Sequence, residues 1–222
     1  LMQAPPSPAA EVTVEEVVTA EQREEFMRVP FRVYGDDPLW VPPLFYMERR
    51  RLTPGQNPFF EFGEAAFFVA RRRGELVGRI SAQVNRRHQE THADKVGHFG
   101  FFDCLDDQEA ANALVASAAA WLRARGCAKM IGPMNLTINE ECGLQVDGFD
   151  SAPAAFMTQA QPWTAGLLEA AGLSKEVDLF AYRMKPADAS ARVRRAARSI
   201  RSSVSRAGIA SGRARISSSR AM

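Results

Sequence analysis

The chain has 222 residues, 46% of them hydrophobic and 9% aromatic, which is enough apolar material for the core of one domain with some appendage. No run of eighteen apolar residues occurs, and the first eight residues lack the basic start and apolar stretch of a secretory signal, so we expect a cytoplasmic protein without a membrane partner. Three widely spaced cysteines argue against a disulfide framework and against a CxxC-type zinc site.

The net charge of +2 is unevenly distributed. Residues 186–222 carry nine arginines against one acidic residue, so this tail is at +8 and residues 1–185 are at −6. The body gives no electrostatic reason to expect a nucleic-acid partner, whereas the tail could supply one. Because the tail is rich in Ser, Arg, Gly and Ala, we expect it to be disordered, either as a basic arm or as out-of-frame translation at a truncated or frame-shifted end.

The predicted domain, residues 11–185, follows a Pro- and Ala-rich segment, residues 1–10, that we expect to be disordered. Alternation and helical spacing predict its first elements. These are a strand over 11–18, a helix over 20–34 kinked or divided by Pro30, a rigid proline connector over 37–43 and a short helix over 44–52.

The middle of the chain predicts a hairpin and a long helix. Two β-rich runs, 65–70 and 76–84, flank Gly74, which supplies the positive φ that a tight turn needs. An Ala-rich helix over 108–125 ends at Gly126, with Asp106 or Asp107 available to cap its start. The other expected elements are a central strand over 97–103, a strand over 129–132, a loop over 133–153, a strand near 154–157, a helix over 162–171 and a closing strand over 177–184.

Two local patterns make the chain resemble the GNAT superfamily of N-acetyltransferases. The run from Phe67 to Gly78 is similar to its strand, turn and "Gly-x-x-Val-Gly" hairpin, and Leu167 to Leu173 is similar to its "Phe-Tyr-Glu-Lys-x-Gly-Phe" helix end. Five further segments resemble a bacterial GNAT-like subgroup that is named for its fold: 37–43, 57–60, 99–102, 132–135 and 139–150. The resemblance implies an α/β (α+β) fold in which helices flank a mixed, mostly antiparallel sheet.

The resemblance also implies where acetyl-CoA would bind. In the superfamily the cofactor lies between two splayed central strands, and a Gly-rich loop at the start of the long helix holds its pyrophosphate. The corresponding cofactor-binding positions in this chain are Phe102, Cys104, Leu105 and Ala110. The loop departs from the family pattern, since it has no glycine and carries Asp106, Asp107 and Glu109, whose carboxylates would repel phosphates. Leu168 stands where the family has its proton-donating tyrosine.

Three acidic residues are candidates for catalysis. Glu140 and Glu141 follow a central strand, and either could be the general base that deprotonates an amine, with Asn135 and Asn139 orienting the substrate. The competing interpretation is that this loop only makes turns and caps. Asp103 could likewise be a base, or a strand-end residue hydrogen-bonded to its neighbours.

Two histidines four residues apart, His88 and His92, would pair on a helix as metal ligands. Because no third ligand is apparent, we interpret 88–92 as a solvated turn and predict no metal.

Two functions therefore compete. The first is transfer of an acyl group from acyl-CoA to a small-molecule or protein amine. The second is a GNAT-fold module that has lost its chemistry and binds a ligand or a protein, a reading motivated by the acidic loop and Leu168.

Overall fold

The structure is a computed structural model that describes residues 11–154 and 157–181. The chain divides into two compact units, residues 1–178 and 179–222. All helices and strands described below belong to the first unit, and the described part of the second, residues 179–181, has no regular secondary structure. The predicted disorder of residues 1–10 and of the tail concerns positions outside the described residues.

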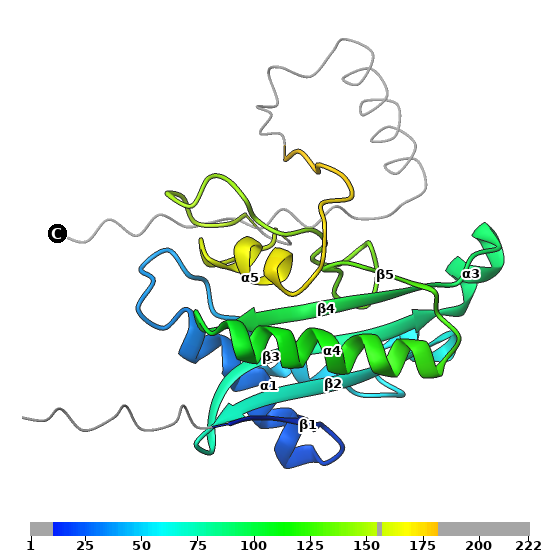
Figure 1. Cartoon of the computed structure of the whole chain (residues 1–222), viewed down its shortest axis with the longest axis horizontal. Helices are drawn as coiled ribbons and strands as arrows, with labels where there is room; N and C mark the ends of the chain where they lie inside the picture. Colours follow the sequence, from blue (N-terminus) through cyan, green and yellow to red (C-terminus); the bar gives the residue numbers. More distant parts are fainter. Residues whose placement is uncertain (1–10, 155–156, 182–222) are drawn as a thin grey trace, which may run out of the picture. The chain divides into compact units, whose positions relative to one another are not determined.

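A five-stranded sheet forms the centre of the first unit, in the order β1-β2-β3-β4-β5 (Figure 1). The first three pairings are antiparallel and the pairing of β4 with β5 is parallel. The strands are β1 (Val12–Glu16), β2 (Gly63–Arg72), β3 (Glu75–Asn85), β4 (Val96–Cys104) and β5 (Lys129–Ile131). The mixed, mostly antiparallel sheet expected from the resemblance is confirmed.

Helices cover both faces of this sheet (Figure 1). The long helix α4 (Gln108–Ala124) packs on one face, where its alanines and leucines and the leucines of α5 (Thr164–Ala170) join the β2, β3 and β4 side chains in one core. Helix α1 (Ala20–Val33) packs on the other face, with α2 (Phe45–Arg51) and the 3-10 helix η1 (Pro58–Glu61) near it, around a second core rich in phenylalanine. Strand β2 serves both cores because its successive side chains point to opposite faces.

The predicted hairpin and caps are found. Arg73 and Gly74 join β2 to β3 with φ of 55° and 80°, so both turn residues have the positive φ of a tight hairpin. Of the two proposed caps for α4, Asp107 is the one that accepts the N–H of Ala110. Pro30 lies inside α1 without ending it, because the helix continues for three residues to Val33.

Three expectations differ from the structure. Residues 86–92 are not a solvated turn but the helix α3 (Arg86–His92), which Asn85 caps through its side chain. Near 154–157 the described residues form no strand, and residues 155–156 lie outside the description. The closing strand expected over 177–184 is absent from 177–181, where the chain finds no ladder partner, and 182–184 are not described.

Strand β4 is irregular near its carboxyl end. Its register against β3 shifts between the pairs Ser81–Gly100 and Arg79–Asp103, which places two residues of β4 in a bulge. Phe101, within the bulge, has a φ of 47°, a region that non-glycine residues seldom adopt. Gly100 beside it lets the loop after β5 approach, since a Cβ there would lie 2.1 Å from the carbonyl oxygen of Met134. The bulge therefore turns β4 toward that loop.

Candidate functional site

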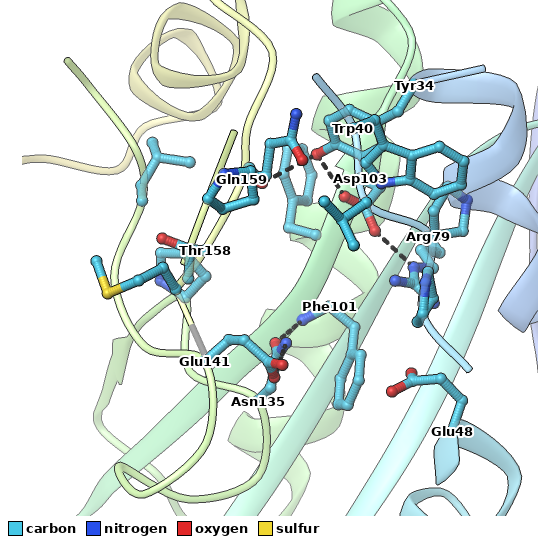
Figure 2. Close-up of a pocket in the computed structure, with 18 of the residues that line it drawn as sticks. Tyr34, Trp40, Glu48, Arg79, Phe101, Asp103, Asn135, Glu141, Thr158 and Gln159 are labelled. Atoms are coloured by element: carbon cyan, nitrogen blue, oxygen red, sulfur yellow. Dashed lines mark hydrogen bonds and ion pairs between the residues drawn. The ribbon is translucent and has the colours of Figure 1, made fainter. Parts of the chain in front are cut away.

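A pocket opens beside the carboxyl end of β4 (Figure 2). The pairing of β4 with β5 ends at His98, and beyond it the loop after β5 lies along β4 in place of a strand. The pocket is lined by the ends of β4 and α1, the connector 37–43, α2, one residue of β3 and the described part of the 133–159 loop. Its polar and aromatic lining residues include Tyr34, Trp40, Glu48, Arg51, Arg79, Asp103, Asn135, Glu141 and Gln159. Sheets of this kind commonly bind ligands at such strand ends.

One wall is a buried ion pair between adjacent strands. The Arg79 Nε atom of β3 donates to Asp103 Oδ2 of β4 at 2.7 Å, and Tyr34 donates its hydroxyl to Asp103 Oδ1, also at 2.7 Å. Burial, followed by the Asp103 carboxylate, raises the pKa of Tyr34 well above its usual range, so this hydroxyl stays protonated. The arrangement gives both carboxylate oxygens of Asp103 a hydrogen-bond partner and links the end of α1 to the sheet.

A second polar group at the pocket gathers three carboxylates around one guanidinium. Arg51 at the end of α2 lies 2.6 Å from Glu141, 3.1 Å from Glu48 and 3.8 Å from Glu140. Its guanidinium carbon also lies 4.7 Å from the centre of the Phe101 ring. The cluster carries two more negative than positive charges when all three carboxyls are ionised, and Arg51 and the glutamates are at most about a quarter exposed.

The pKa values of the two neighbouring glutamates, Glu140 and Glu141, are shifted in opposite directions. Burial raises the pKa of Glu140 to about 7, against a smaller opposing effect of Arg51. Burial acts the same way on Glu141, but Arg51 and the Asn135 amide together hold the pKa of Glu141 below its usual range. At neutral pH Glu141 is therefore a fixed charge, whereas Glu140 can exchange a proton.

Several polar atoms of this site are buried without a partner. Within residues 11–154 and 157–181, Glu140 Oε2, Arg51 Nε and Gln159 Oε1 make no hydrogen bond although they are shielded from solvent. Two of the three are acceptors. Because burying an unpaired polar group costs about 1 to 3 kcal/mol, a ligand that donates hydrogen bonds here would recover stability.

The bulge and the loop are joined by one asparagine. The Asn135 side chain accepts the N–H of Phe101 at 2.6 Å and approaches Glu141 with its amide nitrogen at 3.3 Å (Figure 2). Buried Gln83 of β3 donates to the Met134 carbonyl, which ties the same loop to the sheet from below. Asn135 thus connects the bulge of β4 to Glu141 of the carboxylate cluster by hydrogen bonds.

The start of α4 does not offer the phosphate cradle that the resemblance implies. Asp107 caps the helix and forms a bidentate ion pair with Arg72 at 2.8 and 2.9 Å, and Glu109 lies 2.8 Å from the same arginine. The ion pair with Arg72, together with the hydrogen bond from the Ala110 amide, holds the pKa of Asp107 below its usual range. A carboxylate of the chain itself therefore sits where the anion would bind, and the residues present do not fit the usual pyrophosphate site.

The predicted site residues fall into three groups. Asp103, Phe102, Asn135 and Glu141 line the pocket, and Glu140 adjoins it through Arg51. Asn139 is exposed on the loop, and Leu105 is half-buried at the edge of the core. Cys104 and Ala110 are buried between the sheet and α4, where burial raises the pKa of the Cys104 thiol to about 12. No arrangement of metal-binding side chains occurs among the described residues, including the three histidines.

Sequence reasoning missed the basic and aromatic half of the site. Arg79, Arg51, Tyr34 and Trp40 line the pocket, and Arg79 is 7% exposed. A signal for Arg79 was present, because Arg79, Ser81 and Gln83 place three polar side chains on one face of an otherwise apolar strand. Polar residues that alternate in a buried strand indicate a polar cavity beside it.

Together, the fold and the pocket define a mixed α/β domain with a pocket of acidic, basic and aromatic side chains at the end of its bulged strand β4. Over 163 residues the chain is 40% identical to Protein YghO of Escherichia coli K12, covering 73% of this chain and 42% of that protein. Over 175 residues it is 42% identical to a bacterial ceramide synthase of Caulobacter vibrioides, covering 78% of this chain and 46% of that protein. The chain thus spans less than half the length of these relatives.

Among solved structures, an aminoglycoside acetyltransferase from a soil metagenomic sample matches 78% of this chain and 97% of its own, at 12% identity and a TM-score of 0.49. At this TM-score the fold assignment rests on the strand order of the chain itself. No family model matches the chain. In the described part of the chain, no helix is both long and apolar enough to cross a membrane.

Proposed function

We propose that this chain is an acyltransferase domain that moves an acyl group from an acyl thioester, acetyl-CoA or a longer acyl-CoA, to a small-molecule or protein amine in the cytoplasm. The observation that carries the proposal is the carboxylate cluster around Arg51, which has an excess of negative charge and a buried Glu140 oxygen that makes no hydrogen bond. A protonated amine supplies both the positive charge and the N–H donors that this cluster lacks.

Charge and proton affinity suit this role. A cation about 4 Å from an uncompensated carboxylate gains roughly 4 kcal/mol near a protein surface, compared with about 1 kcal/mol in water. Once the amine is bound, Glu140, with a pKa of about 7, accepts its proton, while Glu141 remains ionised and holds Arg51 and Asn135. The neutral amine nitrogen then forms a bond to the thioester carbonyl carbon, the carbon–sulfur bond breaks, and the thiolate leaves with the second amine proton.

Two lines of similarity support the same chemistry. The GNAT resemblance implies transfer to an amine. A ceramide is an amide of a long-chain amine, so the relative named a ceramide synthase forms an amide bond. The nucleotide end of the donor needs another location than the start of α4, because Asp107 and Arg72 occupy that place.

Because Asp107 and Arg72 pair at the start of α4, a second candidate is favoured, a ligand- or partner-binding module without transfer activity. Such a module needs the acidic pocket but no donor site. It would bind amines through the Arg51 cluster and would show no response to acyl-CoA.

A transfer assay separates the candidates. The full chain is incubated with acetyl-CoA or palmitoyl-CoA and a panel of primary amines, including a long-chain amino alcohol, and amide products are detected by mass spectrometry. We expect an amide product that is lost in Glu140→Gln and retained in Glu169→Gln, a matched change at an exposed helix position. Thermal unfolding with each ligand is measured in parallel, since saturating ligand at a hundred times its Kd adds about 2.7 kcal/mol.

No product, together with stabilisation by amines alone, would reject the transferase and support the binding module. If Glu140→Gln forms the product with unchanged turnover, the proposal of transferase activity stands but Glu140 is not the base.

A further inference from the structure

The connector and α2 expose an unusual amount of apolar surface. Four of the thirteen exposed large hydrophobic side chains in the described residues fall within residues 41–47. They are Val41, Leu44, Tyr46 and Met47, which are 56 to 68% exposed. Clusters of this kind on a protein surface mark a contact with a partner or a membrane, whereas isolated exposed residues need no explanation.

The same surface continues onto α1. Phe31, itself 36% exposed, stacks on Phe45 of α2 with ring centres 5.2 Å apart, and it makes a T-shaped contact with Trp40 of the connector, with ring centres 4.8 Å apart. These ring contacts join α1, the connector and α2 into one apolar face. We call this face, with Phe31 and residues 41–47, the connector surface.

Two arginines border the connector surface. Arg28 lies over the Phe45 ring at 5.7 Å, and Arg50 lies over Tyr46 at 5.7 Å with a hydrogen bond to its hydroxyl at 3.2 Å. Neither forms an ion pair with a carboxylate of the described residues. Apolar side chains, a tyrosine and arginines that extend past them are the composition found where proteins meet lipid headgroups.

The pocket lies beside the connector surface. Val41 and Pro43 line the pocket on this side, and Met157, 44% exposed, lines it from the loop opposite. A molecule dissolved in a lipid layer under this face would therefore meet the pocket edge without crossing water.

We propose that the connector surface docks the protein on an anionic lipid bilayer. Leu44, Tyr46 and Met47 enter the headgroup region, and Arg28 and Arg50 pair with lipid phosphates. This inference revises the expectation of no membrane partner and does not depend on acyl transfer, because it concerns where the protein sits and not what it catalyses.

Vesicle flotation tests the proposal. The full chain is mixed with vesicles of phosphatidylcholine alone or with about a third phosphatidylglycerol, and we expect binding that is stronger to the anionic vesicles. The variant Leu44→Ser/Met47→Ser should lose about tenfold or more in binding, because two large apolar side chains no longer leave water when the protein docks. The control Val18→Ser/Val177→Ser removes equally exposed side chains elsewhere and should bind as the parent does.

The arginine-rich tail could bind anionic vesicles by charge alone, and the design separates that contribution. Binding through the tail would vanish at high salt and would be the same in the parent and in Leu44→Ser/Met47→Ser. Equal binding by these two proteins, or no binding to either vesicle, overturns the proposal. So does a self-association measured by light scattering that only Leu44→Ser/Met47→Ser abolishes, because the surface would then join two copies of the chain.

Discussion

Replacing Glu140 by glutamine should stabilise the protein at neutral and alkaline pH. The folded protein raises the pKa of this carboxyl from 4.5 to about 7, so it binds the proton more tightly than the unfolded chain does. The stability that protonation gives is complete below about pH 4.5 and is lost as the pH rises through about 7. Glutamine resembles the protonated form at every pH. The Glu140→Gln variant should therefore match the parent below the lower value and exceed it above the higher one.

The size of the effect follows from the pKa change. A rise from 4.5 to about 7 corresponds to about 3 kcal/mol at about 1.4 kcal/mol for each factor of ten in proton affinity. The side chain is 25% exposed, and water screens part of that interaction, so we expect a measured gain of about 1 to 2 kcal/mol at pH 8. Urea unfolding at a series of pH values measures the difference as a shift of the midpoint at constant m.

The neighbouring residue provides a control of opposite sign. Because Arg51 and Asn135 lower the pKa of Glu141, its charge stabilises the fold above the unfolded pKa, and this contribution is lost as the pH falls through the folded value. Glu141→Gln should therefore destabilise the protein at neutral pH and approach the parent in acid. If both variants shift stability in the same direction at pH 8, the electrostatic reasoning about the Arg51 cluster is refuted.

Three further substitutions test the frame of the site. Arg79→Met, which leaves Asp103 buried without its cation, should cost about 3 to 5 kcal/mol in denaturant unfolding, and Arg79→Met/Asp103→Leu should recover most of that loss; additive costs would contradict the pair. Asp107→Ala should cost about 1 to 2 kcal/mol at neutral pH. Because the fold lowers the pKa of Asp107, only the ionised carboxyl stabilises it, and the cost should shrink in acid below about pH 4. Asp107→Asn, which can still cap the helix, should cost less. Gly100→Ala should lower the melting temperature by several degrees, given a loss of about 1 to 3 kcal/mol, because its Cβ collides with a loop carbonyl; Gly166→Ala in α5, where a Cβ meets nothing within 4 Å, should not.

The sequence predicts the fold well where local chemistry decides it. The hairpin at Gly74, the cap at Asp107 and the end of α4 beside Gly126 each depend on a few adjacent residues, and each is found. The helix α3 was missed because its seven residues are polar throughout, and its cap at Asn85 is the only local signal. The strand expected over 177–184 shows the opposite case, because its described part, 177–181, is not a strand, and alternation alone cannot supply a neighbouring strand.

The site was predictable only in part, because its halves come from distant segments. Glu140, Glu141 and Asn135 were found since they follow β5, which pairs in parallel with β4, and ligands often bind at the carboxyl ends of parallel strands. Arg51 comes from a helix about ninety residues earlier, and nothing near it in the sequence indicates that it meets Glu141. The assignment of catalytic roles to Glu140, Glu141 and Asp103 stays a prediction.

The hydrogen bond from the Phe101 amide to Asn135 has a consequence for how the pocket forms. It joins residues 34 positions apart, so the bulge in β4 gains this hydrogen bond only when the loop is docked. Conversely, a local opening of the loop would remove Asn135 and Glu141 from the pocket while the paired parts of the sheet and the core beneath α4 stay folded. The pocket can therefore be lost and regained in a protein that remains otherwise native.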